Sequence, residues 1–133
     1  MHDPAPDGAS PLRVLVVDAD ERVRESLAGL LSIGDRLAVV GAAGEPGEAL
    51  ELVAATRPDV LVVDPRLPEV DRGRAMIGRA RRTLPGLCVV VLSWSEALDD
   101  GYLRCDADAF VRKTFRPSEL VEAIVSTRAR TLQ

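Results

Sequence analysis

The sequence predicts a doubly wound α/β fold, in which one parallel sheet carries helices on both faces. Five short apolar runs alternate with five stretches whose apolar residues recur every three or four positions, the pattern of buried strands and amphipathic helices. The connections are short, which favours parallel strands joined through helical crossovers. The chain has 133 residues and is 47% hydrophobic, which suits one domain with a sizeable core and argues against a disordered chain.

The strands are predicted from apolar runs rich in valine and leucine. Residues 14–17 and 60–63 each run into an aspartate, as buried parallel strands do where the chain leaves a sheet. The other three strands are predicted at residues 37–40, 88–92 and 110–111. The expected sheet therefore has five strands.

The helices are predicted from the spacing of apolar residues and from their end signals. Apolar side chains at i, i+4, i+7 and i+8 from Val23 predict the first helix, with Asp20 as a candidate N-cap. Pro46 suits the first turn of the second helix. The remaining helices are predicted near residues 73–83, at 97–103 and after Pro117.

The composition excludes several classes of protein. The formal net charge of −4 argues against a basic nucleic-acid-binding domain. The longest apolar runs have four or five residues, far below the roughly 18 that cross a bilayer. Two cysteines without a CxxC spacing and the absence of a secretory signal favour a cytoplasmic protein with reduced thiols. Residues 1–11 are expected to form a flexible tail before a single domain at residues 12–130.

Polar side chains with useful chemistry follow four of the predicted strands. Asp18 and Asp20 follow the first, Asp64 the third, Ser93 the fourth, and Lys113 the fifth. Lys113 is the only lysine among the 17 basic residues of the chain. Because ligands of doubly wound sheets bind beyond the carboxyl ends of the strands, we expect these side chains to form one site.

The chemistry that these residue types permit is phosphoryl transfer to a carboxylate. Clustered carboxylates repel one another, and Mg²⁺ relieves that cost because it prefers oxygen ligands. A hydroxyl and an ammonium can bind the remaining oxygens of a phosphoryl group. The chain has no GxGxxG after its first strand, no P-loop and no GxSxG elbow. Its single histidine, His2, lies in the expected tail.

The sequence resembles the receiver domain of two-component response regulators over about residues 12–127. The matching segments are VLVVDADERVRESLAGLL (14–31), PDVLVVDPRLPEVD (58–71), VVVLS (89–93) and DADAFVRK (106–113). The resemblance implies a flavodoxin-like sheet with strand order 2-1-3-4-5. It also implies a phosphoacceptor domain rather than an enzyme, phosphorylated by a sensor histidine kinase or a phosphotransfer protein.

The resemblance also implies individual roles. Asp64 matches the phosphoacceptor, and Asp18 matches an acid that binds Mg²⁺ together with the backbone carbonyl of Arg66. Ser93, Phe110 and Lys113 match the residues that respond to the phosphoryl group. The face of the fourth helix, fifth strand and fifth helix is then expected to change partner or to form a homodimer, and we expect no nucleic-acid binding by this chain alone.

Three positions depart from the family pattern. Ala19 replaces the second of two adjacent acids, which predicts weaker Mg²⁺ binding unless Asp20 reaches the metal. Trp94 follows Ser93 where a small residue is usual, and lies either over the mouth of the pocket or on the surface of the fourth helix. Thr114 stands where proline commonly follows the lysine.

These departures leave a second hypothesis beside the phosphorylatable receiver. The chain would then be an atypical receiver that binds partners without phosphorylation. A flavin-binding protein of the same architecture is a third hypothesis, although Asp18 and Asp20 would repel the phosphate of FMN.

Overall fold

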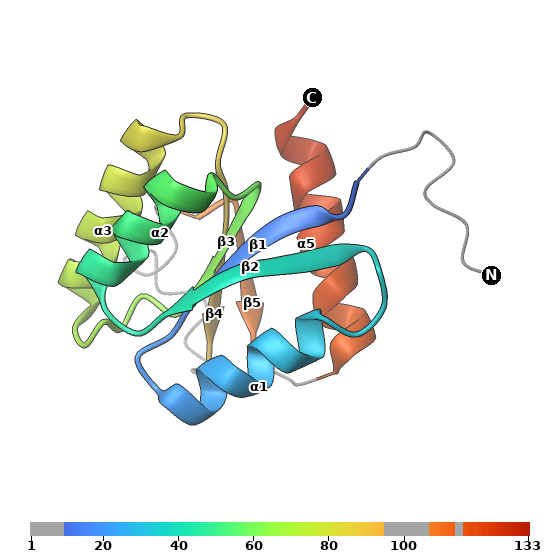
Figure 1. The fold of residues 1–133 in the computed structure, drawn as a ribbon, viewed down its shortest axis with the longest axis horizontal. Helices are drawn as coiled ribbons and strands as arrows, with labels where there is room; N and C mark the ends of the chain where they lie inside the picture. Colours follow the sequence, from blue (N-terminus) through green and yellow to red (C-terminus); the bar gives the residue numbers. More distant parts are fainter. Residues whose placement is uncertain (1–9, 95–106, 114–115) are drawn as a thin grey trace.

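The computed structural model describes residues 10–94, 107–113 and 116–133 (Figure 1). Five parallel strands form one sheet in the order β2-β1-β3-β4-β5. This confirms the predicted doubly wound sheet and the strand order that the resemblance implies. The strands are β1 (Leu12–Val17), β2 (Leu37–Ala43), β3 (Val60–Val63), β4 (Cys88–Ser93) and β5 (Ala109–Arg112).

The described helices cover both faces of the sheet (Figure 1). One face packs against α2 (Pro46–Thr56) and α3 (Val70–Thr83), and the other against α1 (Glu21–Leu31) and α5 (Pro117–Thr131). The helix predicted at 97–103 lies outside the described residues, as do Cys105, Thr114 and residues 1–9 of the predicted tail. None of the described helices is long and apolar enough to cross a membrane.

Two apolar clusters, one on each face of the sheet, form the core. In β1, Leu15 and Val17 face the α2–α3 side, whereas Val14 and Val16 face the α1–α5 side. This alternation follows from the two-residue period of a strand. Because both faces are covered, the central strand β3 is apolar along its whole length, and β1 and β4 are apolar apart from Arg13 and Ser93.

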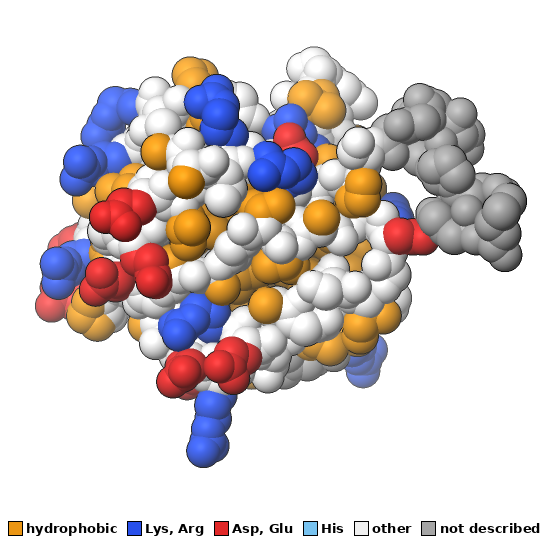
Figure 2. Space-filling model, in the orientation of Figure 1, with side chains coloured by type: hydrophobic (Ala, Val, Ile, Leu, Met, Phe, Trp, Pro, Cys, Tyr) orange, Lys and Arg blue, Asp and Glu red, His pale blue; other side chains and the backbone are white. Residues whose placement is uncertain are grey.

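The β2 strand forms one edge of the sheet and extends farther than predicted. It continues to Ala43, and its register with β1 shifts between Val14 and Leu15, so that Val40 has no partner. Figure 2 shows hydrophobic side chains and backbone along the middle of this side of the molecule, with charged side chains mainly toward the margins. Beyond the shift, Ala43 at the end of β2 pairs with Val17 at the end of β1.

The third helix begins three residues earlier than the predicted start at residue 73. Gly73 lies inside α3, where the helix passes close to the loop that follows β3. A Cβ on Gly73 would lie 1.8 Å from the carbonyl oxygen of Pro65. The glycine is therefore needed for a close approach of the helix to this loop.

Candidate functional site

Four of the predicted site residues lie together at the carboxyl edge of the sheet. Asp18 follows β1, Asp64 follows β3, Ser93 ends β4 and Lys113 follows β5. All four are buried, with exposed fractions of 3%, 8%, 1% and 7%. Because β1, β3, β4 and β5 are neighbours and parallel, their carboxyl ends meet at one edge, and residues distant in sequence become adjacent.

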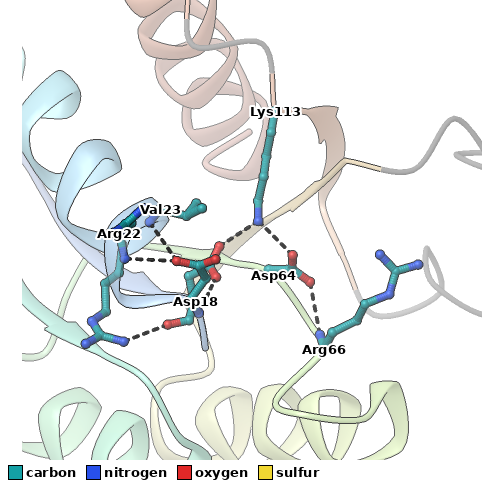
Figure 3. A network of polar contacts seen from close by, with 8 residues as sticks. Asp18, Arg22, Val23, Asp64, Arg66 and Lys113 are labelled. Carbon is teal, nitrogen blue, oxygen red and sulfur yellow. Dashed lines mark hydrogen bonds and ion pairs between the residues drawn. The ribbon is translucent and has the colours of Figure 1, made fainter.

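The ammonium of Lys113 bridges the two aspartates (Figure 3). Its Nζ lies 2.6 Å from Oδ2 of Asp18 and 2.7 Å from Oδ2 of Asp64. The lysine side chain is only 1% exposed, so its charge requires these partners. This contact gives a physical reason for a lysine here, because a compact ammonium with three donors fits between two carboxylates.

Backbone donors orient the other oxygen of each carboxylate. The backbone N–H of Asp20 donates to Oδ1 of Asp18 at 2.9 Å, and that of Arg66 donates to Oδ1 of Asp64 at 3.0 Å. In both loops the donor lies two residues after the aspartate. This spacing is that of the local turn that an aspartate side chain favours. Each carboxylate is thus held from its own loop and from Lys113.

Asp20 is the N-cap of α1, as the sequence indicated. Its Oδ1 accepts hydrogen bonds from the backbone N–H groups of Arg22 at 2.9 Å and Val23 at 3.2 Å, and the residue is exposed. The neighbouring Ala19 is exposed as well. Within the described ranges, no three His, Cys, Asp or Glu residues form a group that could hold a metal ion.

The donor set suits Mg²⁺. Asp18 and Asp64 supply carboxylate oxygens, which Mg²⁺ accepts as ligands together with water and phosphate oxygens. With Lys113, the charges are −2 and +1, so the cluster keeps a net formal charge of −1. This remaining negative charge attracts a divalent cation.

Trp94 contacts the buried lysine. The Nζ of Lys113 lies 5.3 Å from the centroid of the indole, within the range of a cation–π interaction. The Trp94 side chain is large, and the residue is 50% exposed. The ring thus lies beside the ammonium of Lys113, whereas the predicted fourth helix lies outside the described residues.

The remaining predicted site residues lie nearby with less direct contact. The backbone N–H of Lys113 donates to the carbonyl of Ser93 at 3.0 Å. Phe110 in β5 is partly buried and packs against the core cluster on the α2–α3 side. Arg66 is exposed, and its backbone lies in the loop directly after Asp64.

Sequence reasoning missed one residue that contacts the site. The guanidinium of Arg24, in α1, donates from Nη1 to the backbone carbonyl of Asp18 at 3.0 Å. An arginine six residues after a strand-end aspartate has no distinctive sequence signal, because most basic residues of this chain are arginines.

Cys88 lies at the start of β4, away from the carboxyl edge where the aspartates meet. Burial raises the pKa of the Cys88 thiol, and the nearby Asp108 carboxylate raises it further. We therefore expect this thiol to stay protonated and unreactive at neutral pH.

The fold and the acid–lysine cluster together define a doubly wound α/β domain with a carboxylate site at the carboxyl edge of its sheet. The chain belongs to the response regulator receiver domain family, whose model matches residues 14–125. It is a receiver domain of two-component signalling, a class that generally accepts a phosphoryl group rather than acting as an enzyme.

Known relatives agree with this assignment. The chain is 37% identical over 119 residues to the DNA-binding transcriptional activator DevR/DosR of Mycobacterium tuberculosis, covering 85% of this chain and 52% of that protein. It is 34% identical over 123 residues to the response regulator MprA of Mycolicibacterium vanbaalenii, covering 91% and 52%. The chain thus spans about half the length of these relatives.

A solved structure shares the fold. The signal receiver domain of NarL from Mycobacterium tuberculosis superposes with a TM-score of 0.77 at 28% identity, covering 91% of this chain and 98% of that one. This chain therefore matches nearly all of that receiver domain.

Proposed function

We propose that Asp64 accepts a phosphoryl group from the phosphohistidine of a sensor kinase or a phosphotransfer protein in the cytoplasm. A carboxylate oxygen of Asp64 bonds to phosphorus, the bond from phosphorus to the histidine nitrogen breaks, and the histidine keeps that electron pair. The observation that carries the proposal is the buried Lys113 ammonium between Asp18 and Asp64. It is positioned to stabilise added negative charge at Asp64.

Asp64 is the more accessible of the two aspartates. Its side chain is 10% exposed and that of Asp18 is 4% exposed. An incoming phosphodonor therefore reaches Asp64 more easily, while Asp18 keeps its role as a fixed negative charge. This difference supports Asp64 as the acceptor and Asp18 as a metal ligand.

Mg²⁺ is the proposed cofactor, held by Asp18, Asp64 and the backbone carbonyl of Arg66. When bound, the metal neutralises charge on the phosphoryl oxygens. Because Ala19 supplies no carboxylate, we expect the affinity for Mg²⁺ to be low. Asp20 remains a further candidate ligand, although its carboxylate caps α1.

Phosphorylation is proposed to act on the partner face through Ser93, Phe110 and Lys113. A phosphoryl group adds a charge of about −1.5 to −2, which attracts the Lys113 ammonium and the Ser93 hydroxyl. Lys113 and Phe110 belong to β5 and its end, so a shift of either residue changes the surface formed by β5 and α5. The fourth helix, which would complete this face, lies outside the described residues.

Trp94 is proposed to cover the mouth of the pocket. Its indole lies beside the Lys113 ammonium, the group that the phosphoryl oxygens would contact. A bulky ring at this point restricts access of both the phosphodonor and the hydrolytic water, so we expect phosphorylation and dephosphorylation to be slow.

The test is binding of beryllofluoride, a phosphoryl analogue, with Mg²⁺, followed by amide NMR. We expect shifts at residues 18, 64, 93 and 113 in the wild type and none in Asp64→Asn. The variant Ala19→Asp should bind Mg²⁺ at least tenfold more tightly, about 1.4 kcal/mol, because it restores a carboxylate. Unchanged wild-type spectra at saturating Mg²⁺ would contradict the proposal and favour a phosphorylation-independent interaction module.

A further inference from the structure

We propose that Arg24 is a positioning residue that holds Asp18 in its metal-binding orientation, and that it can do so because residue 44 is glycine. The inference rests on the proposed function of the Asp18–Asp64 site. It adds two residues, Arg24 and Gly44, that lie on α1 and on the loop after β2. No substrate or metal contact is assigned to either of them.

Every polar group of Asp18 has a partner, and the side chain of Arg24 binds its backbone carbonyl. The Asp18 N–H donates to the carbonyl of Ala43 at 3.0 Å. Its carboxylate accepts from the backbone of Asp20 and from Lys113. The remaining group, the Asp18 carbonyl, accepts from Nη1 of Arg24 at 3.0 Å. Asp18 is 3% exposed, so loss of Arg24 would leave a buried carbonyl without its partner.

The guanidinium of Arg24 occupies the space beside Gly44. A Cβ built on Gly44 would lie 2.4 Å from Nη1 and 3.3 Å from Cζ of Arg24. The N–H of Gly44 donates to Oε1 of Glu48 at 3.0 Å, which holds this loop on α2. The half-buried Arg24 thus lies against this loop.

Together these contacts join the site to two surrounding elements. Arg24 connects α1 to the end of β1, and the absence of a side chain at Gly44 leaves room for its guanidinium. Outer groups of this kind orient metal-binding side chains and commonly change metal affinity by about 10–100-fold when they are removed. We infer that without Arg24 the loop after β1 relaxes and the Asp18 carboxylate turns away from Asp64.

Two independent substitutions remove the same contact. Arg24→Gln shortens the side chain so that it no longer reaches the Asp18 carbonyl. Gly44→Ala leaves Arg24 intact but displaces its guanidinium, and because the displaced atoms are the end of a flexible side chain, the loop itself should fold normally. Arg24→Lys keeps the charge and one donor group, and should recover part of the wild-type behaviour.

Matched controls lie on the same helix. Arg22→Gln makes the same change in charge at an exposed position. Gly29→Ala adds a methyl group at a position with no heavy atom within 4 Å of the new Cβ. Neither control should change the Mg²⁺ affinity or the ¹³C shift of the Asp18 carboxyl group.

The experiment measures the Mg²⁺ affinity through Trp94 fluorescence, the free energy of unfolding by urea, and the ¹³C shift of the Asp18 carboxyl group in metal-free protein. We expect Arg24→Gln and Gly44→Ala to weaken Mg²⁺ binding by roughly tenfold and to shift the Asp18 carboxyl resonance. We expect the Mg²⁺ affinity and the Asp18 carboxyl resonance of Arg24→Lys to lie between those of these variants and those of the wild type.

Two sets of results overturn the inference. In the first, Arg24→Gln and Gly44→Ala both have the wild-type Mg²⁺ affinity and the wild-type Asp18 carboxyl resonance, whatever their stability. The other is an equal effect of Arg22→Gln, which would make net charge the cause. A wild-type protein that shows no response to beryllofluoride with Mg²⁺ contradicts the proposed function instead, so the two failures are distinguishable.

Discussion

At the scale of single residues, the charge balance of the site depends on Lys113. Its ammonium contacts Asp18 and Asp64, and all three side chains are at least nine-tenths buried. Each carboxylate also has one backbone donor, but these donors carry no full charge. Removing the ammonium would leave two neighbouring carboxylates in a poorly hydrated place.

The variant Lys113→Met is therefore expected to lower the free energy of unfolding by about 3–5 kcal/mol at neutral pH without metal. Mg²⁺ should recover part of this loss, because it replaces the missing positive charge. Urea denaturation with and without Mg²⁺ measures both effects. In the double variant with Asp64→Asn the loss should be smaller, and an unchanged stability of Lys113→Met would show that the ammonium does not compensate the carboxylates.

At the scale of elements, the N-terminus of α1 has a defined cap. Asp20 accepts two backbone hydrogen bonds there, and its negative charge also suits the positive end of the helix dipole. Arg24, one turn farther along, contacts the preceding strand end. The start of this helix thus fixes the loop that carries Asp18.

We expect Asp20→Ala to cost about 1 kcal/mol of stability, within the range of about 0.5–2 for lost caps. Asp20→Ser should keep most of that stability, because serine is also a good cap. If the carboxylate only caps α1, Asp20→Ser binds Mg²⁺ as the wild type does in a fluorescence titration. A clear loss of Mg²⁺ affinity in this variant would identify Asp20 as a metal ligand.

The helix α3 depends on the close approach of its backbone to the loop after Asp64. A side chain at Gly73 would collide with the backbone of Pro65, which cannot move without displacing its neighbour Asp64. We expect Gly73→Ala to lower the free energy of unfolding by about 1–3 kcal/mol, measured by urea denaturation. Gly78→Ala is the control on the same helix, with only the end of Arg82 near its Cβ. Equal stability of the two variants would argue against this contact.

At the scale of the whole molecule, the parallel sheet makes one site from distant segments. Lys113 lies 95 residues from Asp18 and 49 residues from Asp64 in the chain. The strands that end at these residues are separated by at most two neighbours in the order β1-β3-β4-β5. The proposed phosphorylation of Asp64 would therefore be coupled to β5, which lies at the opposite edge of the sheet from β2.

If this coupling reaches the surface of β5 and α5, beryllofluoride with Mg²⁺ should change the association of the protein. We expect the fraction of homodimer of the wild type to rise in analytical ultracentrifugation. The homodimer fraction of Asp64→Asn should be the same with and without the analogue. An NMR response at the site with no change in association would restrict the role of this face to other partners.

Much of the fold and part of the site follow from local patterns in the sequence. Continuous apolar runs indicated all five strands, because strands covered on both faces are apolar throughout. The 3.6-residue period indicated the described helices, because burial along one side of a helix repeats at that interval. The positions of Asp18, Asp64 and Lys113 at strand ends followed from the same patterns. The cap at Asp20 was indicated because its donors lie two and three residues away.

Contacts across space were decided only by the tertiary structure. The bridge through Lys113, the indole of Trp94 beside it and the contact of Arg24 with Asp18 join segments that have no common sequence pattern. The early start of α3 is a further case, because Gly73 is required by the distance to Pro65 and not by helix propensity. Local periodicity reports which side of each element is buried, but the distances between side chains depend on how the packed elements approach one another.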